Sequence, residues 1–236
     1  MVADGDARTL GQAWAQRPCA VARQRAELSP LWVWEGFMAT ENDNYGYTAL
    51  HAFVLIRRVP QGLNIADVIE EIGGTEGAEF PNGRVLFASV FVGAYIGFAH
   101  VRADNLAALQ RLLYGDLYER GVRCEHAVEG PVYSRPGAPP QPMGPKRGSP
   151  PFCALVRVRV AGDPQGVMTE IGRRFQSSDP FQGASVIFGT ADVLVELAGE
   201  SLDAVSRPVL EVIRGTPGVL GTETSFAFTD QWRTPS

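Results

Sequence analysis

The same order of predicted elements occurs twice in this sequence, once on each side of a proline-rich segment. In each copy an apolar strand precedes a helix, two strands that meet at a glycine, a second helix and a last strand. The hairpin glycines Gly93 and Gly189 lie 28 and 29 residues before Gly121 and Gly218, the glycines that precede the two last strands. We therefore expect a duplicated βαββαβ unit.

The proline-rich segment predicts how the chain is divided. Residues 136–151 contain seven prolines, a composition that favours extended polyproline geometry over helix or inner strand. The predicted parts are a partly helical N-terminal arm with a leading strand (1–49), a first domain (50–133), a linker (134–151), a second domain (152–230) and a short tail (231–236).

The fold class follows from the order of elements and from the apolar pattern of the strands. A βαββαβ unit places both helices on one face of a four-stranded antiparallel sheet. The strands at 53–58 and 184–189 carry apolar residues at both alternating positions, as expected when both sheet faces are buried. We expect an α+β fold in which tandem ferredoxin-like repeats pack face to face as an intramolecular, pseudo-dimeric α/β barrel.

Two motifs of the second copy resemble a known family. Gly189-Thr190-Ala191-Asp192 precedes an apolar strand, and Pro217-Gly218-Val219 is followed by Thr222-Glu223-Thr224-Ser225. These motifs are similar to the hairpin and closing strand of the effector-binding (RAM) domain of Lrp/AsnC regulators. The first copy keeps the architecture but has Ile96 where the family has an aspartate. The resemblance implies two tandem RAM-like domains that bind a small-molecule effector, an amino acid being one candidate, and that self-associate in a regulatory rather than a catalytic role.

Carried over residue by residue, the resemblance implies a ligand site that contains Gly189, Thr190, Asp192, Thr222 and Thr224. A carboxylate can hold an ammonium group, while hydroxyls and turn amides can hold a carboxylate. An alternative interpretation is that Asp192 only stabilises the hairpin turn and that the threonines are present as strand formers.

Members of this family carry a basic helix-turn-helix of about fifty residues before the sensor domain. Here 34 residues precede Glu35, they contain four arginines, and Pro18 interrupts the predicted helix. The formal charge of the chain is -5, whereas affinity for a nucleic-acid backbone needs concentrated Lys and Arg. We therefore expect neither a recognisable helix-turn-helix nor direct DNA binding, and a separate DNA-binding partner is a further alternative.

The expected architecture also leaves an enzyme open as a hypothesis, although the regulatory role is preferred. Dimeric α/β barrels include cofactor-free monooxygenases and isomerases that act on small apolar or aromatic substrates. The catalytic candidates are then His100, His126, Tyr95 and Arg57, with a histidine as general base. The sequence contains no HxxxH, HExxH or CxxC pattern, so we predict no metal site and no cofactor.

The longest charge-free apolar stretch runs from Val85 to Ala99, which is shorter than the roughly 20 residues of a membrane-spanning helix. The first ten residues are acidic and contain no apolar leader segment. We therefore expect a cytoplasmic protein that does not contact a membrane.

Overall fold

The computed structural model describes residues 49–73, 79–80, 83–134, 143, 150–175, 180–228 and 232–233. By its internal contacts the chain divides after Asn44, and every described residue belongs to the unit Tyr45–Ser236. Apart from residue 49, the predicted N-terminal arm lies outside the described residues. Most of the predicted linker does as well, except for residues 134, 143, 150 and 151.

We call residues 50–133 the first half and residues 152–228 the second half. The first half contains β1 (Leu50–Arg58), α3 (Ile65–Gly73), β2 (Glu79–Phe80), β3 (Gly83–Val90), β4 (Val92–Gly93), β5 (Gly97–Ala103), α4 (Leu106–Gln110), the π-helical segment η1 (Arg111–Tyr118) and β6 (Arg123–Tyr133). The second half contains β7 (Phe152–Val160), α5 (Pro164–Arg174), β8 (Phe181–Phe188), β9 (Val193–Gly199), α6 (Leu202–Pro208), the π-helical segment η2 (Val209–Ile213) and β10 (Val219–Phe228). A short strand, β11 (Trp232–Arg233), follows.

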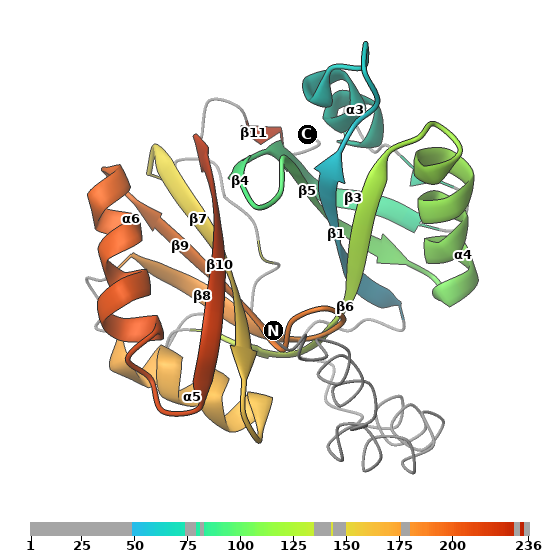
Figure 1. The fold of residues 1–236 in the computed structure, drawn as a ribbon. Coiled ribbons are helices and arrows are strands. Elements are labelled where there is room, and N and C mark those ends of the chain that lie inside the picture. The colour runs from blue at the N-terminus through green and yellow to red at the C-terminus, as the bar shows by residue number, and fades with distance from the viewer. Residues whose placement is uncertain are drawn as a thin grey trace, which may run out of the picture. The chain divides into compact units, whose positions relative to one another are not determined.

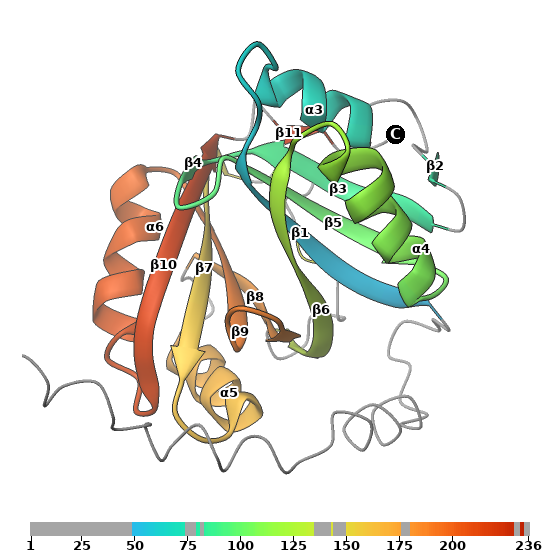
Figure 2. The ribbon, with the colours of Figure 1, turned by 45° about the vertical axis from the view of Figure 1, so that its right-hand side comes forward.

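The strands form one large antiparallel sheet, which confirms the predicted α+β class. Its order is β11-β3-β5-β1-β6-β8-β9-β7-β10-β4, with β2 paired to β3. In both Figure 1 and Figure 2, the helices of each half lie on the side of its strands that faces away from the other half. The two remaining strand faces therefore lie toward each other.

Two glycine hairpins connect the halves. Gly93, in β4, pairs with Ser225 of β10, and Phe188, at the end of β8, pairs with Val128 of β6. A Cβ atom on Gly93 would lie 2.7 Å from the Thr224 carbonyl oxygen, and one on Gly189 would lie 2.9 Å from the His126 carbonyl oxygen. The hairpin of each half therefore approaches the last strand of the other half too closely for a side chain at these positions.

The alternation of side chains along β1 produces two separate apolar layers. Ala52, Val54 and Ile56 belong to the core beneath the helices of the first half, and the second half has an equivalent core of its own. Phe53 and Leu55 belong to a third core, to which both halves contribute. The predicted burial of both strand faces is thus confirmed for β1.

The helix starts agree with the sequence in one half and differ in the other. From the sequence, Ser201 is the predicted N-cap of the second helix of the second half. It is the N-cap of α6, and its Oγ accepts a hydrogen bond from the Ala204 amide (3.1 Å). The sequence also predicts Asp104 as the N-cap of the second helix of the first half, and this prediction is wrong. The extended backbone at Asn105 lets its Oδ1 accept from the Ala108 amide (2.9 Å), so α4 begins one residue later.

The sequence leaves two alternatives for the second helix of the second half, a kink at Pro208 or a start near Pro208. The helix begins at Leu202, so Pro208 does not start it. Proline has no amide proton and its ring crowds the preceding turn, so it disturbs an α-helix at this point. The chain continues after Pro208 as π-helix, in which the Arg214 amide donates to the Val209 carbonyl (3.0 Å). Within the described residues, no helix is long and apolar enough to cross a membrane.

Candidate functional site

Strand β1 carries four residues on the face that points to the other half: His51, Phe53, Leu55 and Arg57. The two middle residues are buried in the shared core, and the two outer residues are polar. At about 3.3 Å per residue, the outer residues are separated by about 20 Å. Two polar clusters therefore lie at opposite ends of one apolar layer.

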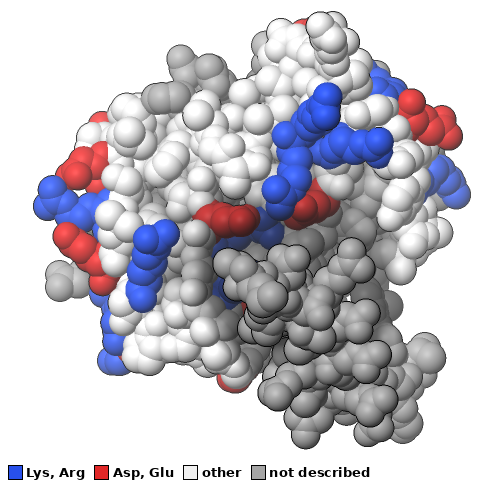
Figure 3. Space-filling view, viewed as in Figure 1, with Lys and Arg blue, Asp and Glu red and all other residues white. Residues whose placement is uncertain are grey.

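The cluster at the Arg57 end contains one Arg–Glu ion pair from each half. Arg57 Nε lies 2.5 Å from Glu125 Oε1, which joins the first and last strands of the first half. Arg157 Nη1 lies 2.7 Å from Glu223 Oε2, which joins the first and last strands of the second half. Basic and acidic side chains lie next to one another in the middle of the face seen in Figure 3.

Tyr95 connects the two ion pairs. Its hydroxyl accepts hydrogen bonds from Arg57 Nη2 (2.9 Å) and from Arg157 Nη1, and it donates to Glu125 Oε2 (2.8 Å). Each guanidinium carbon lies 4.7 Å from the centre of the Tyr95 ring, at cation–π distance. The Tyr95 amide donates to Ser225 Oγ (3.2 Å). One aromatic residue of the first half is therefore held by both halves.

Thr190, in the hairpin between β8 and β9, completes the cluster. Its hydroxyl accepts a hydrogen bond from Arg157 Nη2 and donates to Glu125 Oε2 (2.8 Å). The Arg157 side chain is only 7% exposed, and its Nε has no hydrogen-bond partner among the described residues. A buried guanidinium with a spare donor can bind an additional oxygen ligand.

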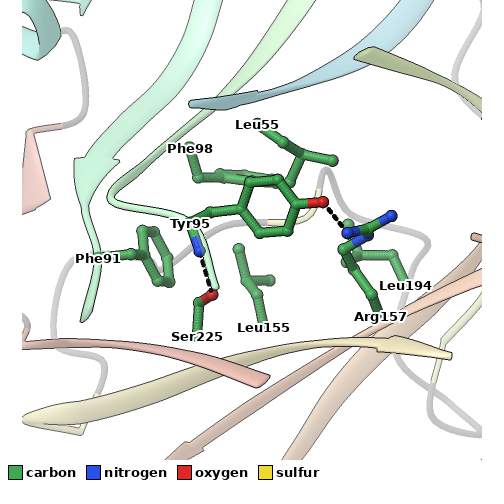
Figure 4. A pocket seen from close by; sticks show the side chains of 8 residues that line it. All are labelled: Leu55, Phe91, Tyr95, Phe98, Leu155, Arg157, Leu194 and Ser225. Carbon is green, nitrogen blue, oxygen red and sulfur yellow. Dashed lines mark hydrogen bonds between the residues drawn. The ribbon is translucent and has the colours of Figure 1, made fainter. Parts of the chain in front are cut away.

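A small cavity lies beside Tyr95 and Arg157, and both residues line it. Figure 4 shows the Tyr95 hydroxyl pointing to the Arg157 guanidinium. The remaining lining residues are mostly apolar: Leu55, Phe91, Phe98, Leu155, Leu194 and Ser225. About 10 Å³ is open to the centre of a water molecule, which is close to the space that one water needs. A metabolite therefore cannot enter this cavity unless side chains at its edge move.

The structure brings only one of the five predicted ligand-binding residues, Thr190, into this cluster. Gly189 contributes backbone that lies against β6. Asp192 Oδ2 accepts a hydrogen bond from the Val160 amide (2.9 Å), so this carboxylate links the hairpin between β8 and β9 to β7. Thr222 and Thr224 pair with Val158 and Val156, on the helix side of the sheet. There Thr222 Oγ1 accepts from Arg214 Nε (2.9 Å).

The four predicted catalytic residues are also divided. Tyr95 and Arg57 are hydrogen-bonded to each other, whereas the two histidines lie on opposite sheet faces. His100 pairs with Phe53, which belongs to the shared core, and His126 pairs with Val54, which faces the helices. The cavity lining contains neither histidine.

Sequence reasoning missed Arg157, Glu125 and Glu223 as site residues. The sequence contains one signal for Arg157, which is the alternation of side chains along apolar strands. Arg157 follows Leu155 by two residues, just as Arg57 follows Leu55, so each arginine shares a strand face with an apolar residue. A charged side chain on the inner face of a core strand needs a partner there. The pattern indicates such a need, but only the strand register shows which residues meet it.

The cluster at the other end of β1 contains His51, His100 and Glu129. Burial lowers the pKa of His51 from 6.5 to about 4, with smaller contributions from the nearby charges of His100, Arg102 and Arg84, while Glu129 acts in the opposite direction. The His100 ring is completely buried, and its centre lies 4.6 Å from that of Phe53.

Comparison with known proteins bears on the half that supplies Arg157 and Thr190. Residues 153–235 match the model of the Lrp/AsnC ligand binding domain. The match covers one copy, so the second copy in the first half stays a prediction. This match supports a ligand-binding role for the second half. No curated protein matches the chain.

Several solved structures are similar to the chain. An anthrone oxidase-like protein is 10% identical, with 81% of this chain and 95% of that chain covered and a TM-score of 0.54, which shows a shared fold. A transcriptional regulator from Neisseria meningitidis in complex with L-Met is 17% identical over 56% of this chain and 73% of that chain (TM-score 0.32). A chlorite dismutase from Candidatus Nitrospira defluvii is 13% identical over 77% of this chain and 91% of that chain (TM-score 0.43).

Proposed function

We propose that this chain is a sensor that binds a small zwitterionic metabolite, of the amino-acid class, at the Arg157 cluster. The observation that carries the proposal is Arg157 itself. It is a buried guanidinium with an unused donor, it lies in the segment that matches the Lrp/AsnC ligand binding domain, and its partners come from both halves.

The charges of the cluster suit a zwitterion. Two guanidinium groups and two carboxylates meet around Tyr95, so their formal charges cancel. A ligand carboxylate can take the place of Glu223 on Arg157, and the ligand ammonium can then pair with the Glu223 carboxylate that has been displaced. Each charge keeps an opposite partner throughout, which avoids the large penalty of an unpaired buried charge.

The space for the ligand opens at the solvent-exposed rim of the cluster, which Arg57 and Glu223 form, rather than in the shared core. The side chains of Arg57 and Glu223 are 47% and 49% exposed, so both can turn outward at little cost. The shared core is filled by apolar side chains, and its cavity has space for about one water. This difference favours a rim-bound effector over a substrate enclosed between the sheets, which the enzyme hypothesis requires.

We further propose that the two halves are tandem copies that act as the two subunits of a pseudo-dimeric α/β barrel, with domains at 50–133 and 152–230. The reciprocal hairpin contacts of Gly93 and Gly189 and the matching Arg–Glu pairs support this arrangement. A ligand at Arg157 then changes the contact between the copies. Self-association, cytoplasmic location and a separate DNA-binding partner stay predictions of this regulatory role.

A thermal-shift screen with free amino acids, simple amines and simple carboxylic acids tests the proposal. A ligand at 100 times its dissociation constant should stabilise the chain by about 2.7 kcal/mol, a rise of several degrees in melting temperature. Glu223→Gln should abolish the shift, because it removes the partner of the ligand ammonium, while Arg207→Gln on the exposed face of α6 should retain it. A shift that persists in Glu223→Gln and in Arg157→Met would overturn the proposal.

A further inference from the structure

Three side chains from neighbouring strands converge at the His51 end of the shared core. His51 lies on β1, His100 on β5 and Glu129 on β6, and β1 is the strand between the other two. The distances are 3.4 Å from His51 Nδ1 to His100 Nε2, 3.5 Å from His51 Nδ1 to Glu129 Oε2 and 3.3 Å from His100 Nε2 to Glu129 Oε2. Three potential metal ligands thus form a nearly equilateral triangle.

The geometry points to a binding site for a divalent transition-metal ion, Zn²⁺ foremost, held by His51, His100 and Glu129. In a tetrahedral zinc site the metal–ligand distances are about 2.0–2.1 Å, so neighbouring ligand atoms lie about 3.3 Å apart. The three observed separations agree with this value without any movement of the side chains. Two imidazoles and one carboxylate also form a ligand set that suits zinc rather than magnesium or calcium, which prefer oxygen ligands.

The second nitrogen of His100 has the partner expected for a metal ligand. His100 Nδ1 lies 3.1 Å from the Met143 carbonyl oxygen. A carbonyl oxygen can only accept, so Nδ1 is the donor in this hydrogen bond, which leaves Nε2 as the nitrogen that can offer a lone pair to a metal ion beside His51 and Glu129. Metal-binding histidines commonly donate their other N–H to a carbonyl or carboxylate, which fixes the tautomer and the ring orientation.

Burial and charge indicate which kind of fourth ligand the ion would take. His100 is fully buried, whereas the His51 and Glu129 side chains are each about one-tenth exposed, so an ion can be reached from their side. Zn²⁺ with one carboxylate ligand keeps a net positive charge. This net charge favours an anion, such as hydroxide or a small carboxylate, at the open position.

The site departs from the sequence-based prediction that no metal is bound. His51 and His100 are 49 residues apart in the chain, so no local motif contains both. Their proximity depends on the pairing of β1 with β5. The site is also independent of the proposed metabolite site, because it lies at the opposite end of β1. A failure of one proposal therefore leaves the other intact.

Metal titration of the chelator-treated full chain tests the proposal. We expect one Zn²⁺ per chain by calorimetry, and one Co²⁺ per chain with the intense visible absorption of tetrahedral cobalt. Glu129→Gln and His51→Gln should each weaken Zn²⁺ binding by more than the roughly 10- to 100-fold that loss of an outer-sphere partner costs, and should abolish the cobalt spectrum. His126→Gln, a histidine on the opposite sheet face, is the matched control and should bind as the parent does.

Circular dichroism and thermal melting without metal will show whether the variants are folded. Glutamine preserves the size of Glu129 and can still hydrogen-bond to the histidines, so the Glu129→Gln variant is the one best able to retain the fold. Absence of stoichiometric binding in the parent chain would overturn the proposal. Equal Zn²⁺ affinity of the parent, Glu129→Gln and His51→Gln would do so as well, because the ion would then be bound elsewhere.

Discussion

The hydroxyl of Tyr95 accepts a hydrogen bond from the buried guanidinium of Arg157, although the two residues belong to different halves of the chain. The guanidinium also lies over the Tyr95 ring, 4.7 Å from its centre. Any ligand that moves Arg157 therefore changes a contact between the halves. In this account that contact transmits the binding event.

Tyr95→Phe should weaken both stability and ligand binding. The variant keeps the ring but removes the hydroxyl that bonds Arg57, Arg157 and Glu125, and so leaves polar groups near the core with fewer partners. We expect a loss of about 1–3 kcal/mol in the free energy of unfolding, measured by urea denaturation. Tyr114→Phe is the control, since Tyr114 is more than half exposed on η1. Equal effects of the two substitutions would contradict the role of Tyr95.

Gly93→Ala should disrupt the contact between the first hairpin and β10. The new Cβ atom would lie 2.7 Å from the Thr224 carbonyl oxygen, and the backbone of Gly93 has a positive φ of 141°. Gly62→Ala is the control that separates the steric clash from the backbone strain. Gly62 also has a positive φ, but no atom lies within 4 Å of the added carbon. Backbone strain alone costs about 1–2 kcal/mol. Chemical denaturation should show a clearly larger loss for Gly93→Ala, and similar losses would mean that the contact adds nothing.

Phe98→Ala should strongly destabilise the shared core. Phe98 is about 1% exposed, and its ring lies within 6 Å of the rings of Phe53, Phe87 and Phe91. Removal of a buried phenylalanine ring costs about 3–5 kcal/mol. Leu220→Ala, at a position that is 71% exposed, should cost less than about 0.5 kcal/mol in the same denaturation experiment. A small loss for Phe98→Ala would argue against a common core.

Cys124 should react slowly with alkylating reagents at neutral pH. Burial, helped by the adjacent carboxylate of Glu125, raises the pKa of the Cys124 thiol from 9.0 to about 11. The thiolate is the reactive form, so near pH 8 we expect alkylation of this cysteine to be roughly 100-fold slower in the folded chain than in urea, measured by peptide mass spectrometry.

The same shift has a consequence for stability. Between about pH 9 and pH 11 the unfolded chain releases the Cys124 proton while the folded chain retains it, so the contribution of this thiol to stability decreases as the pH rises through that range. Cys124→Ser should flatten that part of the stability profile. Equally fast alkylation of the folded and the unfolded chain would contradict the burial of Cys124.

Much of the fold could be predicted because it depends on local patterns. Several features depend on short-range preferences that the structure retains. They are the apolar runs, the glycines at 93 and 189 and the cap at Ser201. The cap at Asn105 was missed because Asp104 is an equally good capping residue, and only the backbone conformation distinguishes the two.

The candidate sites were harder to predict because they depend on long-range strand register. Thr190 was found through a motif, but its partners Arg157 and Glu125 come from other strands. Likewise, His51, His100 and Glu129 are brought together only by the order β5-β1-β6. A sequence pattern shows that a polar residue faces the core, and it does not show which distant residue meets it.

The central claim is tested most directly by calorimetric titration of the full chain with three ligands. These are an amino acid, the corresponding amine without the carboxylate, and the corresponding carboxylic acid without the ammonium group. Because Arg157 needs a carboxylate and Glu223 needs an ammonium group, we predict that the zwitterion binds at one site per chain and that each single-charge analogue binds at least about 100-fold more weakly, a difference of about 2.7 kcal/mol. Equal affinity for the zwitterion and for either analogue, or no heat of binding with any amino acid, would contradict the account.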